Sequence, residues 1–316
     1  MKDKKFEKAL VMGTGMMGPG IALTLAQGGL QVKLVGRTDQ SAERGMKNFQ
    51  TCLKRLRDQK LLRVSEASKI ERFVSGSTKI LAEAAASDLI IESIVEDLKT
   101  KRNFFLQLEN VCSTSTVFTS NTSGYRITEI TSSLNHPERT VTTHFWNPPY
   151  LIPLVEVIMG DRSSPEIAQS VYDLLKKCGK SPVLIRKDVP GQLGNRLLHA
   201  VIREAAYMVQ EGICTAEDID TAVKNGFGLR FPVFGPLDHT DIVGVDLVAS
   251  VQTSLAPHLC NVPECLPILR EKVDRRELGA STGKGFYDWS IRNPDKVRRI
   301  RDEFIIRRLK ERKKGY

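Results

Sequence analysis

The most constraining feature of the sequence is a glycine pattern near its amino terminus. Gly13, Gly15 and Gly18 follow the apolar run KALVM directly and open the helix-like segment PGIALTLAQGG. The first glycine permits a tight turn, the second lets the backbone approach a pyrophosphate, and the third lets helix pack on strand. The helix amino terminus then presents a positive dipole end to phosphate groups. We predict a dinucleotide site here, with Met16 and Met17 beside it.

The first half of the chain alternates short apolar strands with helical stretches. The expected strands are KALVM, VKLV, DLIIES, VFTSN, VTTHF and LVEVI. This alternation predicts a Rossmann-type, doubly wound parallel sheet of the α/β class over residues 1–188. Long amphipathic segments follow, including NRLLHAVIREAAYMVQEG and a helix that Thr215 caps, with Asp218 completing a capping box. A smaller all-helical domain is therefore expected over residues 189–316.

Composition excludes several classes of protein. The 316 residues are 41% hydrophobic and 27% charged, as in ordinary globular chains. No apolar run approaches the roughly 20 residues of a membrane span, and the amino terminus reads as a first strand and not as a signal peptide. Six scattered cysteines without a CxxC pair predict reduced thiols, a cytoplasmic location and no structural metal site.

The net charge of +10 is concentrated in the tail. Residues 291–316 contain eleven Lys or Arg and four Asp or Glu, which gives +7 and leaves +3 for the rest. Such a tail has two interpretations, a nucleic-acid-binding segment or a solvated helix with one packed face. Helical spacing of apolar residues favours the packed helix, so no nucleic-acid or membrane partner is predicted. The residues of that expected face are Val297, Ile300, Phe304, Ile305 and Leu309.

A histidine and a glutamate indicate chemistry in the segment VTTHFWNPPYLIPLVEVI. His144 ends an expected strand, and Glu156 lies in another after a Pro-rich turn. A carboxylate on one ring nitrogen fixes the tautomer of a histidine and raises its basicity. A carboxylate inside an apolar run is seldom buried without a partner. The alternative is an unconnected loop histidine and strand-edge glutamate.

Taken together, these motifs resemble the 3-hydroxyacyl-CoA dehydrogenase family over residues 9–289. The resemblance rests on GTGMMGPGIA, IESIVEDLKTK, TSNTSGYRITEI, HFWNPPYLIPLVEVI, KDVPGQLGNRLL, EGICTAEDID, FGPLDHTDIVGVD and STGKGFYDW. It implies a nicotinamide-dependent oxidoreductase in which hydride and a hydroxyl proton leave the substrate together. The sequence features also resemble the gulonate dehydrogenase (lambda-crystallin) subgroup.

The resemblance also assigns roles to individual residues. It implies that His144 is the catalytic base, that Glu156 orients it, and that Ser123 and Asn195 contact the substrate oxygen. It places Asn147 near the nicotinamide. The cofactor residues that it adds are Glu96 and Lys101. From the residues alone, Ser123 would be interpreted as a turn residue and Asn195 as a helix-start residue.

The substrate is less constrained than the reaction. Family frequency favours a 3-hydroxyacyl-CoA, whereas the NPPYLIPLVEV stretch, Ser281 and the basic tail resemble relatives that act on hydroxy acids without coenzyme A. Gulonate-, carnitine- and pyridine-carboxylate-like substrates are thus the alternative. Five cations on one expected helix could bind the phosphates of coenzyme A, or they could simply form the solvated face of that helix. They are Lys47, Lys54, Arg55, Arg57 and Lys60.

The segment VKLVGRTD bears on the choice of cofactor. An acid at the end of the second strand of such folds binds the adenosine ribose and marks NAD. Gly36 stands there instead, followed by Arg37, which suits phosphate oxygens, and Thr38, whose hydroxyl adds a donor. The sequence therefore favours NADP over NAD, although Asp39 could reach the ribose.

Two further expectations concern assembly and activity. Apolar segments of the helical domain, such as IVGVDLVASV, exceed what a few helices bury among themselves, and the family resemblance implies a homodimer. A structural or nucleic-acid-binding protein on a retired dehydrogenase scaffold is the remote alternative. Retention of His144, Glu156, Ser123 and Asn195 together argues against it.

Overall fold

The computed structural model describes residues 5–313, so residues 314–316 of the predicted tail lie outside it. The chain divides into two compact units. The first contains Met1–Leu193 together with Arg301–Tyr316, and the second contains Gly194–Ile300.

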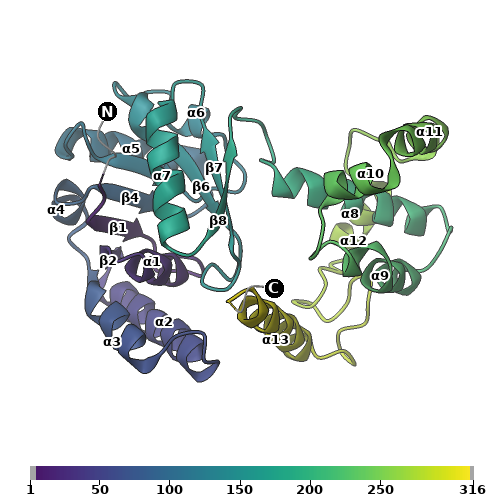
Figure 1. Cartoon of the computed structure of the whole chain (residues 1–316), viewed down its shortest axis with the longest axis horizontal. Coiled ribbons are helices and arrows are strands. Elements are labelled where there is room, and N and C mark those ends of the chain that lie inside the picture. Colours follow the sequence, from purple (N-terminus) through teal and green to yellow (C-terminus); the bar gives the residue numbers. More distant parts are fainter. Residues whose placement is uncertain (1–4, 314–316) are drawn as a thin grey trace. The chain divides into compact units, whose positions relative to one another are not determined.

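The first unit is built on one eight-stranded sheet of order β3-β2-β1-β4-β5-β6-β7-β8 (Figure 1). Its strands are β1 Lys8–Met12, β2 Gln31–Val35, β3 Val74–Ser77, β4 Leu89–Glu92, β5 Val117–Ser120, β6 Thr140–Phe145, β7 Leu154–Met159 and β8 Ser181–Ile185. The six strands from β3 to β6 in this order are parallel, β7 pairs antiparallel with β6, and β8 pairs parallel with β7. The predicted doubly wound sheet is confirmed, with a reversed pair of strands at one edge.

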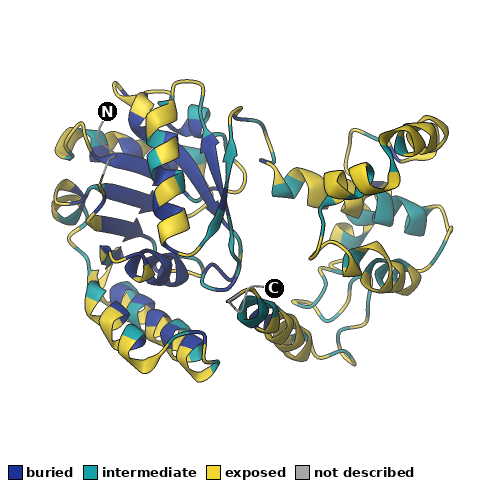
Figure 2. Ribbon diagram, in the orientation of Figure 1, coloured by how far each residue is buried: buried dark blue, intermediate teal, exposed yellow. Residues whose placement is uncertain are grey.

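Helices cover both faces of the sheet. Those of the first unit are α1 Gly18–Gln27, α2 Asp39–Asp58, α3 Val64–Phe73, α4 Ile80–Ala85, α5 Leu98–Val111, α6 Ile127–Ile130, α7 Pro165–Lys177 and the 3₁₀ turn η1 Pro137–Arg139. One apolar cluster joins α1, α2, α3 and α7 to one sheet face, and a second joins α4, α5 and α6 to the other. Figure 2 shows the result, with dark, buried strands between helices whose outer faces are exposed.

Two strand features were not expected from the sequence. Strand β3 reads VSGS and has a single apolar residue, so no periodicity marked it. The reversal of β7 follows from the short turn after β6, because a parallel partner would require a crossover of a dozen or more residues. That reversal sets Glu156 directly opposite His144 in the ladder.

The second unit is helical, as predicted. It comprises α8 Gly194–Gln210, α9 Ala216–Asn225, η2 Phe227–Leu229, α10 Pro236–Val243, α11 Val245–Leu255, η3 Ala256–His258, α12 Pro267–Asp274 and the start of α13 Pro294–Lys313. The predicted capping box of α9 is present, because Thr215 and Asp218 exchange hydrogen bonds between side chain and backbone. Its described core is small, with Ala206, Cys260 and Leu266 buried.

The unit boundary differs from the predicted division at residue 188. The first unit runs to Leu193, and the chain from Arg301 onward returns to it. Ile306 is 3% exposed in the cluster that contains Leu53 and Leu56, whereas Phe304 of the predicted face is 52% exposed. Ile305 and Leu309 of the predicted face pack against this cluster, and Asp302 binds Arg55 with 2.8 Å between Oδ2 and Nη2.

The helices also bear on the question of a membrane. Among residues 5–313, none of the helices combines the length and the hydropathy that a membrane span requires.

Candidate active site

The strands β6 and β7 bring His144 and Glu156 together. The two residues are directly opposed in an antiparallel ladder, so their side chains project from the same sheet face at close range. His144 Nδ1 lies 2.6 Å from Glu156 Oε2, and the exposed fractions are 5% for His144 and 0% for Glu156. An ionised carboxylate only accepts hydrogen bonds, so Nδ1 is the donor of this pair and Nε2 faces away from the carboxylate. The predicted pairing of these residues is present.

Ser123 meets the other side of the imidazole. Its hydroxyl Oγ lies 3.1 Å from His144 Nε2, at an exposed position after β5. Glu96 holds this loop, because Oε1 accepts from the Thr122 hydroxyl, from Ser123 N at 3.1 Å and from Gly124 N at 2.8 Å. Burial raises the pKa of Glu96, but these hydrogen bonds and the charge of Lys101 outweigh it and leave the pKa below its ordinary value.

Lys101 is enclosed and not open to the surface. Its side chain is 1% exposed, and Nζ lies 2.7 Å from Glu92 Oε1 and 3.1 Å from Glu96 Oε2. Of the two predicted cofactor residues, Glu96 and Lys101, Glu96 is thus the one that is exposed. Sequence reasoning did not single out Glu92, which is 0% exposed and also accepts from Ser120 and Ile94 N. A glutamate inside the apolar run LIIE was the available signal, as for Glu156.

Two further donors reach Glu156 that the sequence did not reveal. The indole Nε1 of Trp146 lies 3.0 Å from Oε2, and the backbone N–H of Leu193 lies 2.9 Å from Oε1. Asn147 is exposed in the turn after β6. Asn195 lies near the start of α8, in the second unit.

The glycines form a cradle that fits a dinucleotide. Gly13 has φ +118°, and a Cβ there would lie 2.2 Å from Ser93 O. A Cβ at Gly18 would lie 1.8 Å from Gly13 O, whereas at Gly15 it would meet open space. Gly13 and Gly18 therefore cannot carry a side chain, because the turn and the start of α1 pack closely there. Space remains next to Gly15. Met16 is 78% exposed beside this space, and Met17 is half-buried.

A cavity of about 550 Å³ opens from the glycine turn along the carboxyl ends of β1, β2 and β4. Ligands of doubly wound sheets bind at such strand ends, where the strand order reverses. Gly36, Arg37 and Arg44 line it, together with Ser41. Thr38 instead caps α2, since its hydroxyl accepts from Ser41 N at 3.2 Å. Arg44, one turn along α2, is a cation that the sequence reading missed.

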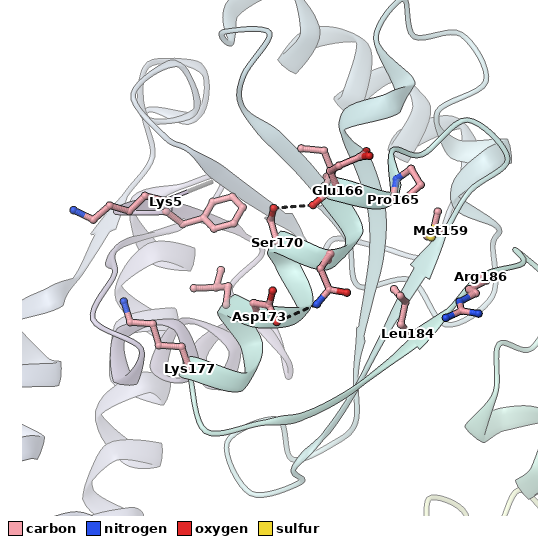
Figure 3. Close-up of a pocket in the computed structure, with 13 residues that line it drawn as sticks. Lys5, Met159, Pro165, Glu166, Ser170, Asp173, Lys177, Leu184 and Arg186 are labelled. Carbon is pink, nitrogen blue, oxygen red and sulfur yellow. Dashed lines mark hydrogen bonds between the residues drawn. The ribbon is translucent and has the colours of Figure 1, made fainter. Parts of the chain in front are cut away.

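A larger hollow of about 1390 Å³ lies apart from these residues, over α7 and β8 (Figure 3). Two hydrogen bonds are drawn in Figure 3. The Ser170 hydroxyl donates to the backbone carbonyl of Glu166, and the Gln169 amide donates to Asp173. None of the predicted site residues lines it. Size alone does not mark a site, so we assign the chemistry to the His144 side of the sheet.

Two family models match the chain in tandem. The 3-hydroxyacyl-CoA dehydrogenase NAD-binding domain matches residues 8–189, and the 3-hydroxyacyl-CoA dehydrogenase C-terminal domain matches residues 191–289. Together they span most of the chain. The helix α13 follows the second match.

Individual relatives agree with the family models. The 5-formyl-3-hydroxy-2-methylpyridine 4-carboxylate 5-dehydrogenase of Mesorhizobium japonicum is 32% identical, over 95% of this chain and 97% of its own length. A probable 3-hydroxybutyryl-CoA dehydrogenase of Bacillus subtilis is 36% identical, over 90% of this chain and 98% of its own.

Solved structures give the same result. The crystal structure of a 5-formyl-3-hydroxy-2-methylpyridine 4-carboxylic acid 5-dehydrogenase, described as an NAD⁺-dependent dismutase, has a TM-score of 0.87 at 30% identity and covers 98% of both chains. The (S)-3-hydroxybutyryl-CoA dehydrogenase of Ralstonia eutropha has a TM-score of 0.76 at 30% identity, over 90% of this chain and 99% of its own. This chain therefore belongs to the 3-hydroxyacyl-CoA dehydrogenase family and is a nicotinamide-dependent dehydrogenase.

Proposed function

We propose that the enzyme interconverts a 3-hydroxy and a 3-oxo group, with His144 as the base. The observation that supports this is the position of its imidazole, held by Glu156 at Nδ1 and facing the Ser123 hydroxyl at Nε2. The nicotinamide supplies the hydride chemistry when bound. His144 Nε2 takes the hydroxyl proton in oxidation and returns it in reduction.

Ser123 and Glu156 support this proton transfer in different ways. Glu156 stabilises the imidazolium that forms, because its charge is buried beside the ring. Ser123 donates to the substrate oxygen as negative charge develops on it. We assign the same role to Asn195 on the family resemblance. We expect Ser123→Ala to oxidise the substrate much more slowly than wild type while binding the cofactor equally well. Full activity of this variant would remove Ser123 from the mechanism.

A coenzyme A thioester is the first candidate substrate. The family models and the Bacillus relative, named a 3-hydroxybutyryl-CoA dehydrogenase, support it. Among the cations considered for its phosphates, Lys47, Lys54 and Lys60 lie on or just after α2. Such a site would have to use these lysines or Arg57, which also lies on α2.

A free hydroxy acid is the second candidate, and contacts of α2 favour it. Arg55 is engaged by Asp302 at 2.8 Å and by the Tyr150 hydroxyl at 3.2 Å, so it is not free to bind a phosphate. The terminal helix α13 also covers part of α2 through Ile306. The Mesorhizobium relative, named for a pyridine carboxylate, matches 95% of this chain.

A substrate panel separates the two candidates. Initial rates should be measured with 3-hydroxybutyryl-CoA, free 3-hydroxybutyrate, gulonate, carnitine and a hydroxymethylpyridine carboxylate. Saturable turnover of the thioester alone would assign the enzyme to the first class. Turnover of a free acid that coenzyme A esters do not reproduce would assign it to the second.

We propose that the enzyme prefers NADP to NAD. Arg37 and Arg44 line one cavity, and guanidinium groups bind phosphate oxygens through paired hydrogen bonds. A Cβ on Gly36 would lie 2.3 Å from Ser41 Oγ, so the start of α2 occupies the place of the acid that marks NAD enzymes. The carboxylate of Asp39 accepts from the Thr78 hydroxyl at 3.2 Å, which leaves it less available for a ribose.

The cofactor proposal is tested by binding and not only by rate. Calorimetry should give dissociation constants for NADP⁺ and NAD⁺ with wild type, Arg37→Ala, Arg44→Ala and the control Arg57→Ala. A hydrogen bond to a charged group contributes about 1.5–3 kcal/mol, so each of the first two variants should weaken NADP⁺ roughly ten- to a hundredfold. Equal weakening of both cofactors, or a wild type that binds NAD⁺ ten times more tightly, would contradict it.

We also propose a cytoplasmic homodimer. The described cysteines are free thiols, in keeping with a reducing compartment. The second unit exposes large apolar side chains, including Leu237 at 78% and Ile242 at 70%. Burial in a subunit interface would remove this surface from water. A monomeric mass by light scattering at micromolar concentration would contradict the dimer.

A further inference from the structure

Trp146 shares an oxygen of Glu156 with the histidine. Its indole Nε1–H lies 3.0 Å from Glu156 Oε2, the atom that His144 Nδ1 meets at 2.6 Å, and the two rings are 5.6 Å apart. Resting on the function proposed above, we propose that Trp146 is a positioning residue that competes with His144 Nδ1 for Glu156 Oε2 and so weakens the hydrogen bond by which Glu156 supports the imidazole.

The local fold explains why the indole reaches this carboxylate. Successive side chains of an extended segment alternate between faces, so Trp146 follows His144 on the same side while Phe145 points away. Phe145 is 2% exposed in the apolar cluster on the α7 side. Trp146 is half-buried, and its donor points at a carboxylate that is 0% exposed.

The effect on His144 follows from competition for one oxygen. A carboxylate raises the pKa of a histidine by stabilising its charged form, and a second donor on the same oxygen draws electron density away from that hydrogen bond. The indole N–H is a donor only, so it cannot take or release a proton itself. Leu193 N holds the other oxygen at 2.9 Å, which fixes the carboxylate plane. The imidazolium is therefore stabilised less than it would be by Glu156 alone.

Other titratable groups near the pair are held by different partners. The strands β5 and β8 contain none, since they read VFTS and SPVLI. The groups of α7 lie across the sheet, because α7 packs with Val155 and Val157, which alternate with Glu156. Three of the remaining groups are carboxylates that accept hydrogen bonds: Glu96 from Gly124 N, Glu129 of α6 from Arg126, and Asp188 from the Thr128 hydroxyl. The fourth, Lys180, donates to the carbonyls of Pro149 and Ile152. Trp146 thus donates to the same carboxylate oxygen as His144.

The first test is the pH profile of Trp146→Phe. Phenylalanine keeps an aromatic ring and removes the donor. The acidic limb of kcat/KM for oxidation reports His144 in the free enzyme, and it should move to higher pH by about half to one unit, with activity largely retained on the alkaline plateau. The chain has two tryptophans, so Trp289→Phe is the matched control. Trp289 packs on Tyr287 and Arg292 in the second unit, and its variant should keep the wild-type limb.

A second test needs no turnover. In Trp289→Phe, Trp146 is the sole indole, and its emission should titrate with the pKa of the adjacent imidazole. Adding His144→Gln should abolish that titration. A flat emission profile in Trp289→Phe, or a Trp146→Phe variant that loses rate equally at every pH with an unmoved limb, would overturn the role of Trp146. Full activity of His144→Gln would instead overturn the proposed base.

Discussion

Two buried carboxylates in the same sheet show how differently one group can be used. Glu92 ends β4 and Glu156 lies in β7, and both are 0% exposed. Glu92 is paired with the ammonium of Lys101 at 2.7 Å, and Glu156 with the imidazole of His144 at 2.6 Å. The carboxylates are alike, so the difference lies in the partner.

The partner decides whether the buried charge is fixed or exchangeable. The ammonium of Lys101 is held by the carboxylates of both Glu92 and Glu96, and both attractions favour its charged form. A histidine changes its charge close to neutral pH, so the same kind of pairing produces a group that can exchange a proton. Lys101 also binds Glu96, which holds the loop that carries Ser123, whereas His144 lies next to the Ser123 hydroxyl itself. Structural and chemical roles are thus separated by side-chain type at equal burial.

The largest expected effect is on stability and comes from Lys101→Met. Removing one partner of a buried ion pair leaves an uncompensated charge, which costs about 3–5 kcal/mol of unfolding free energy. Denaturant unfolding measures this, with Lys224→Met as the control. Lys224 pairs with Asp220 at 3.0 Å on the surface, and such pairs contribute only about 0.3–0.5 kcal/mol. Equal losses in the two variants would mean that burial does not distinguish them.

The next effect is on catalysis and comes from His144→Gln. Loss of a general base should lower kcat at least about 10²-fold, while the dissociation constant of the cofactor stays unchanged. His136→Gln is the control, because His136 also meets a carboxylate, Glu138 at 3.2 Å, but on the surface. Turnover near the wild-type rate in His144→Gln would remove it as the base.

Glu156→Gln should change both rate and pH dependence. Without the carboxylate the imidazolium loses its stabilising charge. The acidic limb of kcat/KM should move to lower pH by about one unit or more, opposite in sign to Trp146→Phe, and kcat should fall. Measuring the acidic limb of kcat/KM in Glu156→Gln and in Trp146→Phe shows directly whether the two shifts have opposite signs. An unmoved limb in Glu156→Gln would exclude Glu156 from the proton transfer.

Sequence patterns predicted the parts of this molecule that rest on local chemistry. The glycine cradle, the strand rhythm and the α9 capping box depend on neighbours in the chain, and so does the His144–Glu156 pair once a short turn forces an antiparallel ladder. These were predicted. Glu92 was not singled out, although its place in an apolar run gave the same signal as that of Glu156.

Contacts between distant segments were not predictable in the same way. The bond from Leu193 N to Glu156 joins residues 37 apart, and nothing in the composition of either segment requires it. Helical spacing correctly put Ile305 and Leu309 on the packed face of α13. It did not reveal that Phe304 is exposed or that Asp302 pairs with Arg55. Arg44 was not singled out, because it reaches the cavity only once α2 forms and places it beside the space that Arg37 also lines.

The smallest effect concerns a buried lysine that has no carboxylate among its described contacts. Lys180 Nζ donates to the carbonyls of Pro149 and Ile152 in the turn between β6 and β7, and desolvation lowers its pKa from 10.5 to about 8. Between about pH 8 and 10.5 the unfolded chain binds this proton and the folded chain does not, so stability from this group rises with pH. Relative to Lys180→Met, the wild-type unfolding free energy should increase by about 1 kcal/mol per pH unit across this window, and stay level below it. The buried thiol of Cys178, whose pKa is raised to about 12 by burial, acts in the opposite direction and interacts with Lys180, so the comparison is made in a Cys178→Ser background. A difference that is flat from pH 8 to 10.5 would mean that Lys180 stays charged when buried, and that the carbonyl oxygens of Pro149 and Ile152 suffice to hold an ammonium.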